Sequence, residues 1–129
     1  MKSLKPYLIF SGNCEEALTF YSACLNGEIT MLHRFADSPL DVPEESKEKV
    51  FNSEFRAESV RFMASDNLPP YSTTVGTNFA LFIAFSDEQE QESVFAKLSE
   101  GGKTLMPLNR GFGMLEDTYG VRWMLALAG

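Results

Sequence analysis

Residues 10–31 (FSGNCEEALTFYSACLNGEITM) align without a gap with residues 85–106 (FSDEQEQESVFAKLSEGGKTLM), at a constant offset of 75. Six of the 22 aligned positions are identical, and they fall at predicted element boundaries and on helix faces, where geometry selects the residue type. The identical pairs are Phe10/Phe85, Ser11/Ser86, Glu15/Glu90, Phe20/Phe95, Gly27/Gly102 and Met31/Met106. Two copies are too few for a solenoid. The repeat therefore indicates two copies of one unit in one fold, an arrangement that often places a site between copies.

Both copies predict a strand followed by a helix. In the first copy, residues 5–10 are a short apolar run typical of a buried strand, and Asn13 is a candidate helix N-cap. The helix then has one apolar stripe and stops at Asn26-Gly27, where both residues tolerate positive φ. The stripe consists of Ala17, Phe20, Tyr21 and Cys24. In the second copy the strand covers residues 78–85, and the helix runs from Asp87 to Gly101-Gly102.

Three further strands are predicted in each copy, so the chain reads βαβββ twice. They cover residues 28–35, 50–57 and 60–65, and then 103–109, 111–117 and 121–127. We expect one domain over 1–129, with repeat 1 at about 4–65, a linker at 66–76 and repeat 2 at about 77–128. A four-stranded sheet with one helix leaves its other face uncovered. The predicted fold is therefore α+β, with the two uncovered faces turned together into a curved, half-closed barrel or cup.

Composition limits the classes of partner and compartment. The net charge of −7 disfavours nonspecific nucleic-acid binding, which needs clustered Lys and Arg. No stretch approaches the ~20 apolar residues of a membrane span, and the first apolar run is too short for a signal peptide. Cys14 and Cys24 are ten residues apart in one predicted helix, about 15 Å, which is too far for a disulfide. Free thiols suggest a reducing compartment, so we expect a cytoplasmic protein without nucleic-acid or membrane partners.

Four segments, taken in order, resemble the vicinal oxygen chelate superfamily, which includes glyoxalase I, extradiol dioxygenases and bleomycin-resistance proteins. They are PYLIFSGNCEEALTFY (6–21), RFMASD (61–66), LSEGGK (98–103) and EDTYGVRWML (116–125), and they look most like its PhnB-like branch. The resemblance implies the βαβββ cup and a homodimer, often formed by exchange of repeat units. It also implies a divalent metal held by His and Glu side chains inside the cup.

The positions that carry these metal ligands in the superfamily hold other residues here. The first-strand position corresponds to Pro6, and its counterpart in the second copy to Ala80, or to Leu81 if the repeat offset is followed. The PhnB-like pattern K-x-x-H-A-E places Asn52 at the His position and keeps Glu54, and the last-strand Glu aligns with Met124. An amide and a thioether are poor ligands for this chemistry. We therefore predict no metal site in the familiar place and no cofactor.

Period-2 counting predicts which residues line the inside of the cup. The predicted lining consists of Pro6, Leu8, Phe10, Asn52, Glu54, Arg56, Ala80, Phe82, Ala84, Arg122, Met124 and Ala126. Among these, we expect the ligand contacts to be Asn52, Glu54, Phe82, Arg122 and Met124. Apolar walls with a few convergent polar groups are typical of small-molecule sites.

Two charged candidates each have a structural alternative. Burial in an apolar cup would favour Glu54 as a base or as the partner of a cationic ligand group; the alternative is an ion pair with Arg56, Arg61 or Arg122. The guanidinium of Arg122 suits a substrate carboxylate or phosphonate, and the alternative is a pair with Glu54 or Glu116.

His33, the chain's one histidine, is the other candidate catalytic group, because imidazole titrates near neutral pH. Strand alternation places it on one face with Ile29, Met31 and Phe35, where a lone histidine is more often a satisfied core or interface residue. Trp123 is expected to point to the helix layer, and Asp66 is expected to be a turn residue at a strand end.

Three functions remain open at this point. One is a protein that binds a small apolar or zwitterionic molecule in the cup without the usual metal. The second is a divergent lyase, isomerase or oxygenase-type enzyme that uses Glu54 or His33. The third is a structural or regulatory homodimer whose cup is filled by its own Phe and Met side chains. The sequence lacks the glycine-rich strand-to-helix loop of nucleotide-type cofactor sites.

Overall fold

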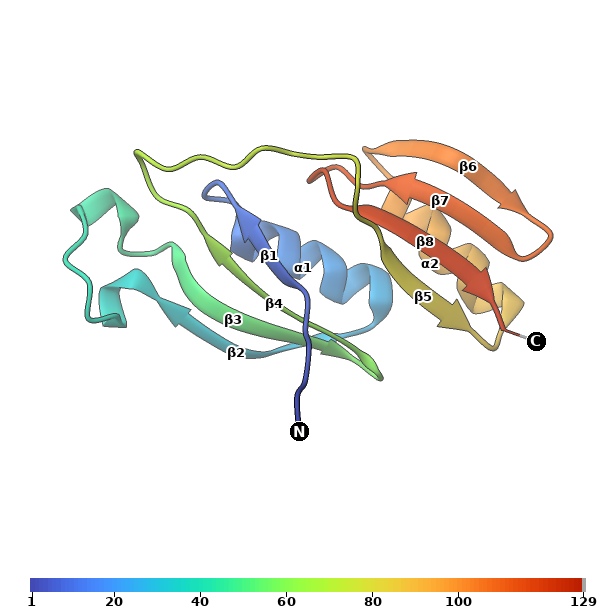
Figure 1. Ribbon diagram of the computed structural model, residues 1–129, viewed down its shortest axis with the longest axis horizontal. Coiled ribbons are helices and arrows are strands. Elements are labelled where there is room, and N and C mark those ends of the chain that lie inside the picture. Colours follow the sequence, from blue (N-terminus) through green and yellow to red (C-terminus); the bar gives the residue numbers. More distant parts are fainter. Residues whose placement is uncertain (129) are drawn as a thin grey trace. The chain divides into compact units, whose positions relative to one another are not determined.

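The computed structural model describes residues 1–128 as two compact units, Met1–Thr73 and the part from Thr74 onward. Each unit is a mixed four-stranded sheet with one helix packed on one face (Figure 1). This is the α+β fold with two βαβββ repeats predicted from the sequence. The shared cup stays a prediction. Among residues 1–128, neither helix is long and apolar enough to cross a membrane.

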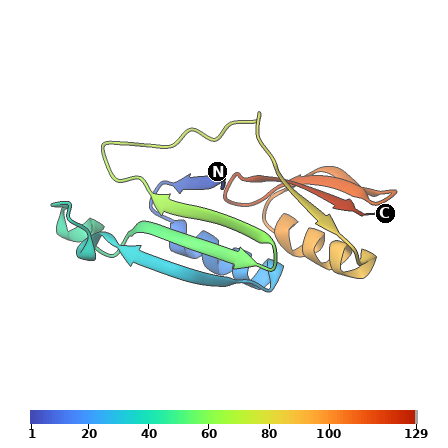
Figure 2. The same ribbon diagram turned by 60° about the horizontal axis from the view of Figure 1, so that its bottom comes forward.

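The first unit contains four strands, one α-helix and two short 3₁₀ turns. The elements are β1 (Tyr7–Phe10), α1 (Cys14–Leu25), β2 (Glu28–Arg34), η1 (Phe35–Asp37), η2 (Glu44–Ser46), β3 (Val50–Ala57) and β4 (Val60–Asp66). The strand order is β1-β4-β3-β2; β1 runs parallel to β4, and the other neighbours are antiparallel. Figure 2 shows α1 beneath this sheet, so the opposite face is uncovered within the unit.

The second unit repeats this topology. The elements are β5 (Leu81–Phe85), α2 (Glu88–Ser99), β6 (Lys103–Asn109), β7 (Phe112–Glu116) and β8 (Arg122–Leu127). The strand order is β5-β8-β7-β6, with β5 parallel to β8. The predicted strand over 78–85 begins later than expected, at Leu81.

Each core lies between the helix and one face of its own sheet. In the first unit, Phe55 and Phe62 stack with ring centroids 4.8 Å apart, and Tyr21 meets the edge of Phe62. In the second unit, Trp123 is fully buried and its indole Nε1 donates a 2.8 Å hydrogen bond to Asp117 Oδ2. The predicted direction of Trp123, towards the helix layer, is thereby confirmed.

The repeated glycines mark the closest approach between each helix end and its sheet. At Gly27, a Cβ atom would lie 2.6 Å from Phe55 Cζ and 2.8 Å from Arg56 O. At Gly102, a Cβ atom would collide with the carbonyl oxygen of Glu116. No other residue type fits these positions without a shift of the neighbouring atoms, which explains why both copies keep glycine.

Two local predictions for the first unit are wrong. A β-bulge between Ile29 and Met31 breaks the alternation of β2, so Ile29 does not share a face with Met31 and His33. Phe35 lies in a 3₁₀ turn and is buried.

The side chain of Asn13 makes no capping hydrogen bond. Asp66, predicted to be a turn residue, is the last residue of β4, and its carboxylate binds the start of α1 instead. Oδ1 accepts from the backbone N–H groups of Gly12 (3.0 Å) and Cys14 (2.9 Å), and Oδ2 accepts from that of Val50 (2.9 Å).

Candidate functional site

The register of the first sheet corrects the predicted face of β1. Leu8 lies opposite Ala64 and Phe10 opposite Asp66, both of which are buried on the helix side. The uncovered face of β1 is therefore formed by Tyr7 and Ile9, which are 46% and 51% exposed. Pro6, Leu8 and Phe10 were predicted to face inwards, and the structure excludes this for the two strand residues.

The side chains on the uncovered face of the first sheet form three rows that run across the strands. A middle row runs Tyr7, Met63, Glu54, Met31 across β1, β4, β3 and β2. A row on one side of it pairs Ile9 with Ser65 on β1 and β4, and Asn52 with His33 on β3 and β2. A row on the other side runs Arg61, Arg56, Glu28. The face thus combines apolar, hydrogen-bonding and charged side chains, as a small-molecule site requires.

The imidazole of His33 is oriented by Asn52. The two side chains lie on neighbouring strands, and His33 Nδ1 is 2.8 Å from Asn52 Oδ1. Because an amide oxygen only accepts hydrogen bonds, the ring nitrogen Nδ1 is the donor. In the neutral ring, Nε2 then carries the free lone pair, on an exposed side chain. This nitrogen can accept a proton or a ligand hydrogen bond.

The carboxylate of Glu54 is paired with Lys5, and not with Arg56 or Arg61, the predicted partners within the same unit. Lys5 Nζ lies 3.4 Å from Glu54 Oε2, and the two side chains are 41% and 27% exposed. The segment before β1 is held beside β4 by a 2.9 Å hydrogen bond from Met63 N to Pro6 O. Period counting missed this pair because Lys5 precedes the strand.

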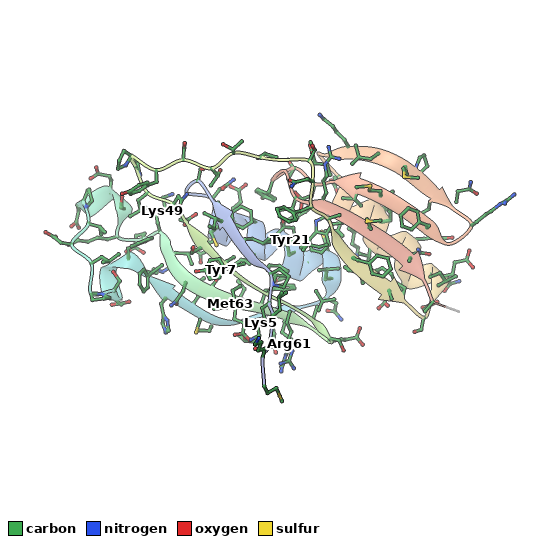
Figure 3. All side chains as sticks on the ribbon, viewed as in Figure 1. Lys5, Tyr7, Tyr21, Lys49, Arg61 and Met63 are labelled. Carbon is green, nitrogen blue, oxygen red and sulfur yellow. The ribbon has the colours of Figure 1, made fainter. Side chains whose placement is uncertain are left out.

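Figure 3 labels Lys5, Tyr7, Met63 and Arg61 along the β1–β4 side of this sheet. Arg56 Nη2 on β3 forms a 2.7 Å ion pair with Glu28 Oε1 on β2. Arg61 on β4 lies opposite Arg56 in the register, and within residues 1–128 its side chain forms no hydrogen bond or ion pair. Two arginines therefore stand next to each other at one end of the face.

The uncovered face of the second sheet is mainly apolar. Its middle row runs Phe82, Met124, Met114, Met106 across β5, β8, β7 and β6. Phe82 is 60% exposed and Met106 50% exposed. The predicted positions of Phe82, Arg122 and Met124 all lie on this face. The predicted pair of Arg122 with Glu116 is confirmed, since Nε and Oε1 are 3.3 Å apart.

The side chains on these faces do not fit the metal site of the superfamily. After the correction of β1, the first-strand positions on the uncovered faces hold Tyr7 and Phe82, while the other positions hold Asn52, Glu54 and Met124. The first unit offers a phenol, an amide and one carboxylate at these positions, and the second offers a phenyl and a thioether. Neither set supplies the donors that such a metal needs. Residues 1–128 contain no group of three or more His, Cys, Asp or Glu side chains placed to hold a metal.

Cys14 is not a reactive thiol. It is fully buried at the start of α1. Burial, reinforced by the nearby carboxylate of Asp66, raises the pKa of the Cys14 thiol from 9.0 to about 12. A buried thiol with this pKa stays protonated at neutral pH and is a poor nucleophile. Cys24 is also buried.

The topology of each unit defines the class of protein: an α+β protein of the glyoxalase and fosfomycin-resistance fold. Its fold is similar to that of the fosfomycin resistance protein FosX from Listeria monocytogenes, with a TM-score of 0.69 at 10% identity, over 99% of this chain and 92% of that one. At that identity the likeness concerns the fold alone.

Within this class, the chain belongs to the 3-demethylubiquinone-9 3-methyltransferase family, which it matches over residues 2–126. It is 35% identical to protein PA1353 from Pseudomonas aeruginosa, with 98% of each chain covered and a TM-score of 0.87. It is 30% identical to the PhnB protein from Bacillus cereus, a putative 3-demethylubiquinone-9 3-methyltransferase, over 98% of this chain and 100% of that one, with a TM-score of 0.78. Protein YjdN of Escherichia coli K12 is 26% identical over 137 residues, covering 95% of this chain and 92% of that protein. The chain is thus a PhnB- and YjdN-like protein.

Proposed function

We propose that this protein binds a small molecule with an apolar body and charged groups on the uncovered faces of its sheets, without the usual metal. The observation that carries the proposal is the exposure of large apolar side chains on the faces opposite the helices. Tyr7, Ile9 and Phe82 are 46%, 51% and 60% exposed. Apolar side chains that gather at an exposed face next to polar groups are characteristic of binding sites.

The polar groups on the first sheet favour a zwitterionic ligand. Glu54 is partly exposed and lies opposite Met63 in the register. Its Oε2 atom is 3.4 Å from Lys5 Nζ, which is a long distance for an ion pair. An exposed pair of this kind contributes little stability, so a ligand ammonium group can replace the lysine at small cost. Asn52 and His33 offer hydrogen bonds in the next row.

The experiment uses a neutral apolar dye, Nile red, with L-tryptophan and indole as competitors. We expect the protein to bind the dye, and Tyr7→Ala or Phe82→Ser to weaken that binding several-fold. Glu54→Gln should weaken displacement by L-tryptophan and leave displacement by uncharged indole unchanged. Glu92→Gln, an exposed change on α2 with the same charge effect, is the matched control. EDTA should change none of these values; failure to bind the dye, or loss of binding with EDTA, would refute the proposal.

A second candidate function is acid–base catalysis, which the His33–Asn52 hydrogen bond favours. The 2.8 Å contact fixes the ring so that Nε2 is the basic nitrogen on the exposed side. Proton abstraction from a carbon acid can be followed as solvent deuterium exchange by NMR. This candidate predicts exchange that both His33→Gln and Glu54→Gln abolish; exchange equal to that of buffer contradicts it.

The family description names methyl transfer, and we do not extend that chemistry to this chain. The strand-to-helix connections are Ser11-Gly12-Asn13 and Ser86-Asp87, which are short and contain a single glycine. Binding of a nucleotide-type methyl donor at such a connection relies on a glycine-rich loop. The small-molecule proposal needs no such cofactor.

A homodimer is the partner that we propose for this chain. The β6 edge of the second sheet, where Met106 is 50% exposed, is a surface that a second copy would cover, leaving Phe82 on β5 to the ligand. Sedimentation velocity should give twice the mass of 14.4 kDa, and Met106→Ser should shift the equilibrium towards the monomer. A monomer at all protein concentrations contradicts this proposal alone.

A further inference from the structure

We infer that Arg61, together with Arg56 and Lys5, forms a subsite for an oxyanion group of the ligand: a carboxylate, phosphate or phosphonate. This inference rests on the proposed function, because it concerns the ligand bound on the uncovered face of the first sheet. It specifies an anionic group of that ligand, bound at the end of the face that carries Arg61 and Arg56.

The charged rows of the two units have different orders of charge. In the second unit, Arg122, Glu116 and Lys103 lie across β8, β7 and β6, so the signs alternate as plus, minus, plus. In the first unit the equivalent row across β4, β3 and β2 is plus, plus, minus. Its members are Arg61, Arg56 and Glu28. Both units thus have the outer arginine, whereas its neighbour is Glu116 in the second unit and Arg56 in the first.

Arg61 consequently lies among cations. Arg56 stands directly opposite it on β3, and Lys5 is at the same end of the sheet, before β1 (Figure 3). Like charges opposite each other in a sheet are destabilising. The equivalent Arg122 avoids this cost through its 3.3 Å pair with Glu116. An oxyanion between Arg61 and Arg56 would remove the same cost in the first unit.

The acids at this end are not placed to neutralise Arg61. Glu28 is held by Arg56 at 2.7 Å, and Glu54 is held by Lys5 at 3.4 Å. Glu58 is exposed in the turn between β3 and β4, and within residues 1–128 it forms no ion pair. Arg61 is exposed, so its five N–H donors are available to a carboxylate or phosphate.

The pocket beside Arg56 and Arg61 has room for an oxyanion, and the side chains next to it indicate the body of the ligand that carries this group. Arg56 and Arg61 line an open pocket of about 380 Å³ together with Gly27 and Ala57. Glu28 and Glu58 also line it; Glu28 is paired with Arg56, and Glu58 forms no ion pair within residues 1–128. Met63, two residues further along the same face of β4, lies beside Tyr7. Two residues of a strand span about 7 Å. A ligand with an anionic group and an aromatic or aliphatic body about 7 Å away therefore matches this end of the face.

The test measures thermal unfolding at constant ionic strength with inorganic phosphate, phenylphosphonate or chloride. Phosphate at about ten times its Kd should raise the Tm by about 3–5 °C relative to chloride. Phenylphosphonate should bind about tenfold more tightly than phosphate, because Tyr7 and Met63 would bury roughly half of its ring. Tyr7→Ala should remove this difference and keep the phosphate effect.

Variants of Arg61 decide the assignment. Arg61→Gln should abolish the specific phosphate shift and leave only the general stabilisation that phosphate gives any protein. Arg61→Glu should raise the Tm in chloride, because it places a carboxylate opposite Arg56, as in the second unit. Arg110→Gln, an exposed change with the same charge effect in the β6–β7 turn, should behave like the natural chain.

The possible results separate this inference from the proposed function. Equal phosphate shifts for the natural chain and Arg61→Gln would overturn the oxyanion subsite. If Arg61→Gln still binds phenylphosphonate and Nile red as tightly as the natural chain, the subsite is wrong and binding on the face stands. If neither Nile red nor phenylphosphonate binds the natural chain, both proposals fall.

Discussion

The uncovered faces of the two sheets share one register and carry different chemistry. The middle row of the first sheet is Tyr7, Met63, Glu54, Met31, and the middle row of the second is Phe82, Met124, Met114, Met106. Three of the four positions keep an aromatic or a methionine. At the third, Glu54 of the first unit corresponds to Met114 of the second. In the middle row, a charged group therefore occurs only in the N-terminal copy, among aromatic and methionine side chains that both copies share.

The two helix N-termini are also held differently. Asp66 belongs to the end of β4 and binds backbone N–H groups of the β1–α1 connection and of β3. Asp87 is a local N-cap that accepts a 3.2 Å hydrogen bond from Gln89 N. The second unit ties its helix to the sheet through the buried Gln91, whose Nε2 donates to Gly111 O (3.0 Å) and Leu125 O (3.2 Å). The first unit therefore depends on one carboxylate for three connections.

The largest predicted effect distinguishes these two aspartates. Asp66→Ala leaves three backbone N–H groups without an acceptor and should lower the free energy of unfolding by about 3–4 kcal/mol. Asp87→Ala removes a single exposed cap and should cost about 1 kcal/mol. Urea denaturation followed by circular dichroism measures both values.

Asp66→Asn is the control for the charge. It keeps one acceptor oxygen and should therefore fall between the natural chain and Asp66→Ala. Equal losses for Asp66→Ala and Asp87→Ala would show that the two helix starts are held with the same strength, which contradicts the three hydrogen bonds of Asp66 and the single one of Asp87.

Replacing either of the repeated glycines with alanine should lower the free energy of unfolding, by a different amount at each position. Gly102→Ala places Cβ against the backbone of Glu116 and Asp117, which cannot move without disturbing β7, and should cost about 3 kcal/mol. Gly27→Ala meets the Phe55 ring and Arg56 O, and should cost about 2 kcal/mol because the ring can shift. Thermal unfolding of both variants tests the order. A neutral Gly102→Ala would contradict the close approach of α2 and its sheet.

A third prediction concerns the pH dependence of stability. The thiol of Cys14 contributes to it in the first unit, and the second unit has no such thiol. Burial raises the pKa of its thiol from 9.0 to about 12. Between these pH values the unfolded chain has lost a proton that the folded chain keeps, so the free energy of unfolding falls as pH rises. At pH 10 the resulting loss in the free energy of unfolding should be about 1.4 kcal/mol. Cys14→Ala should flatten the stability profile between pH 9 and 11; an unchanged slope would mean that the thiol ionises equally in both states.

The fold was predictable from the sequence, and half of the candidate site was not. The repeat and its period-3.6 stripes located both helices, because buried faces constrain residue type strongly. Which side chains of β1 face the helix was not predictable, because Leu8, Ile9 and Phe10 show no alternation of polar and apolar residues. Only the parallel register of β1 with β4 decides it. The Lys5–Glu54 and His33–Asn52 pairs depend on register between distant segments, which no local pattern records.

The smallest predicted effect concerns two equivalent arginines and has opposite signs. Arg122 is 20% exposed and pairs with Glu116, which is 18% exposed, so Arg122→Gln should cost about 1 kcal/mol by leaving a half-buried carboxylate without its partner. Arg61→Gln removes one of two facing cations and should be neutral or stabilising by a few tenths of a kcal/mol. Paired urea titrations in chloride buffer measure the difference. If both variants lose the same stability, Arg61 has a partner that holds it as firmly as Glu116 holds Arg122. The proposed contrast between a neutralised row in the second sheet and an anion-accepting row in the first would then be lost.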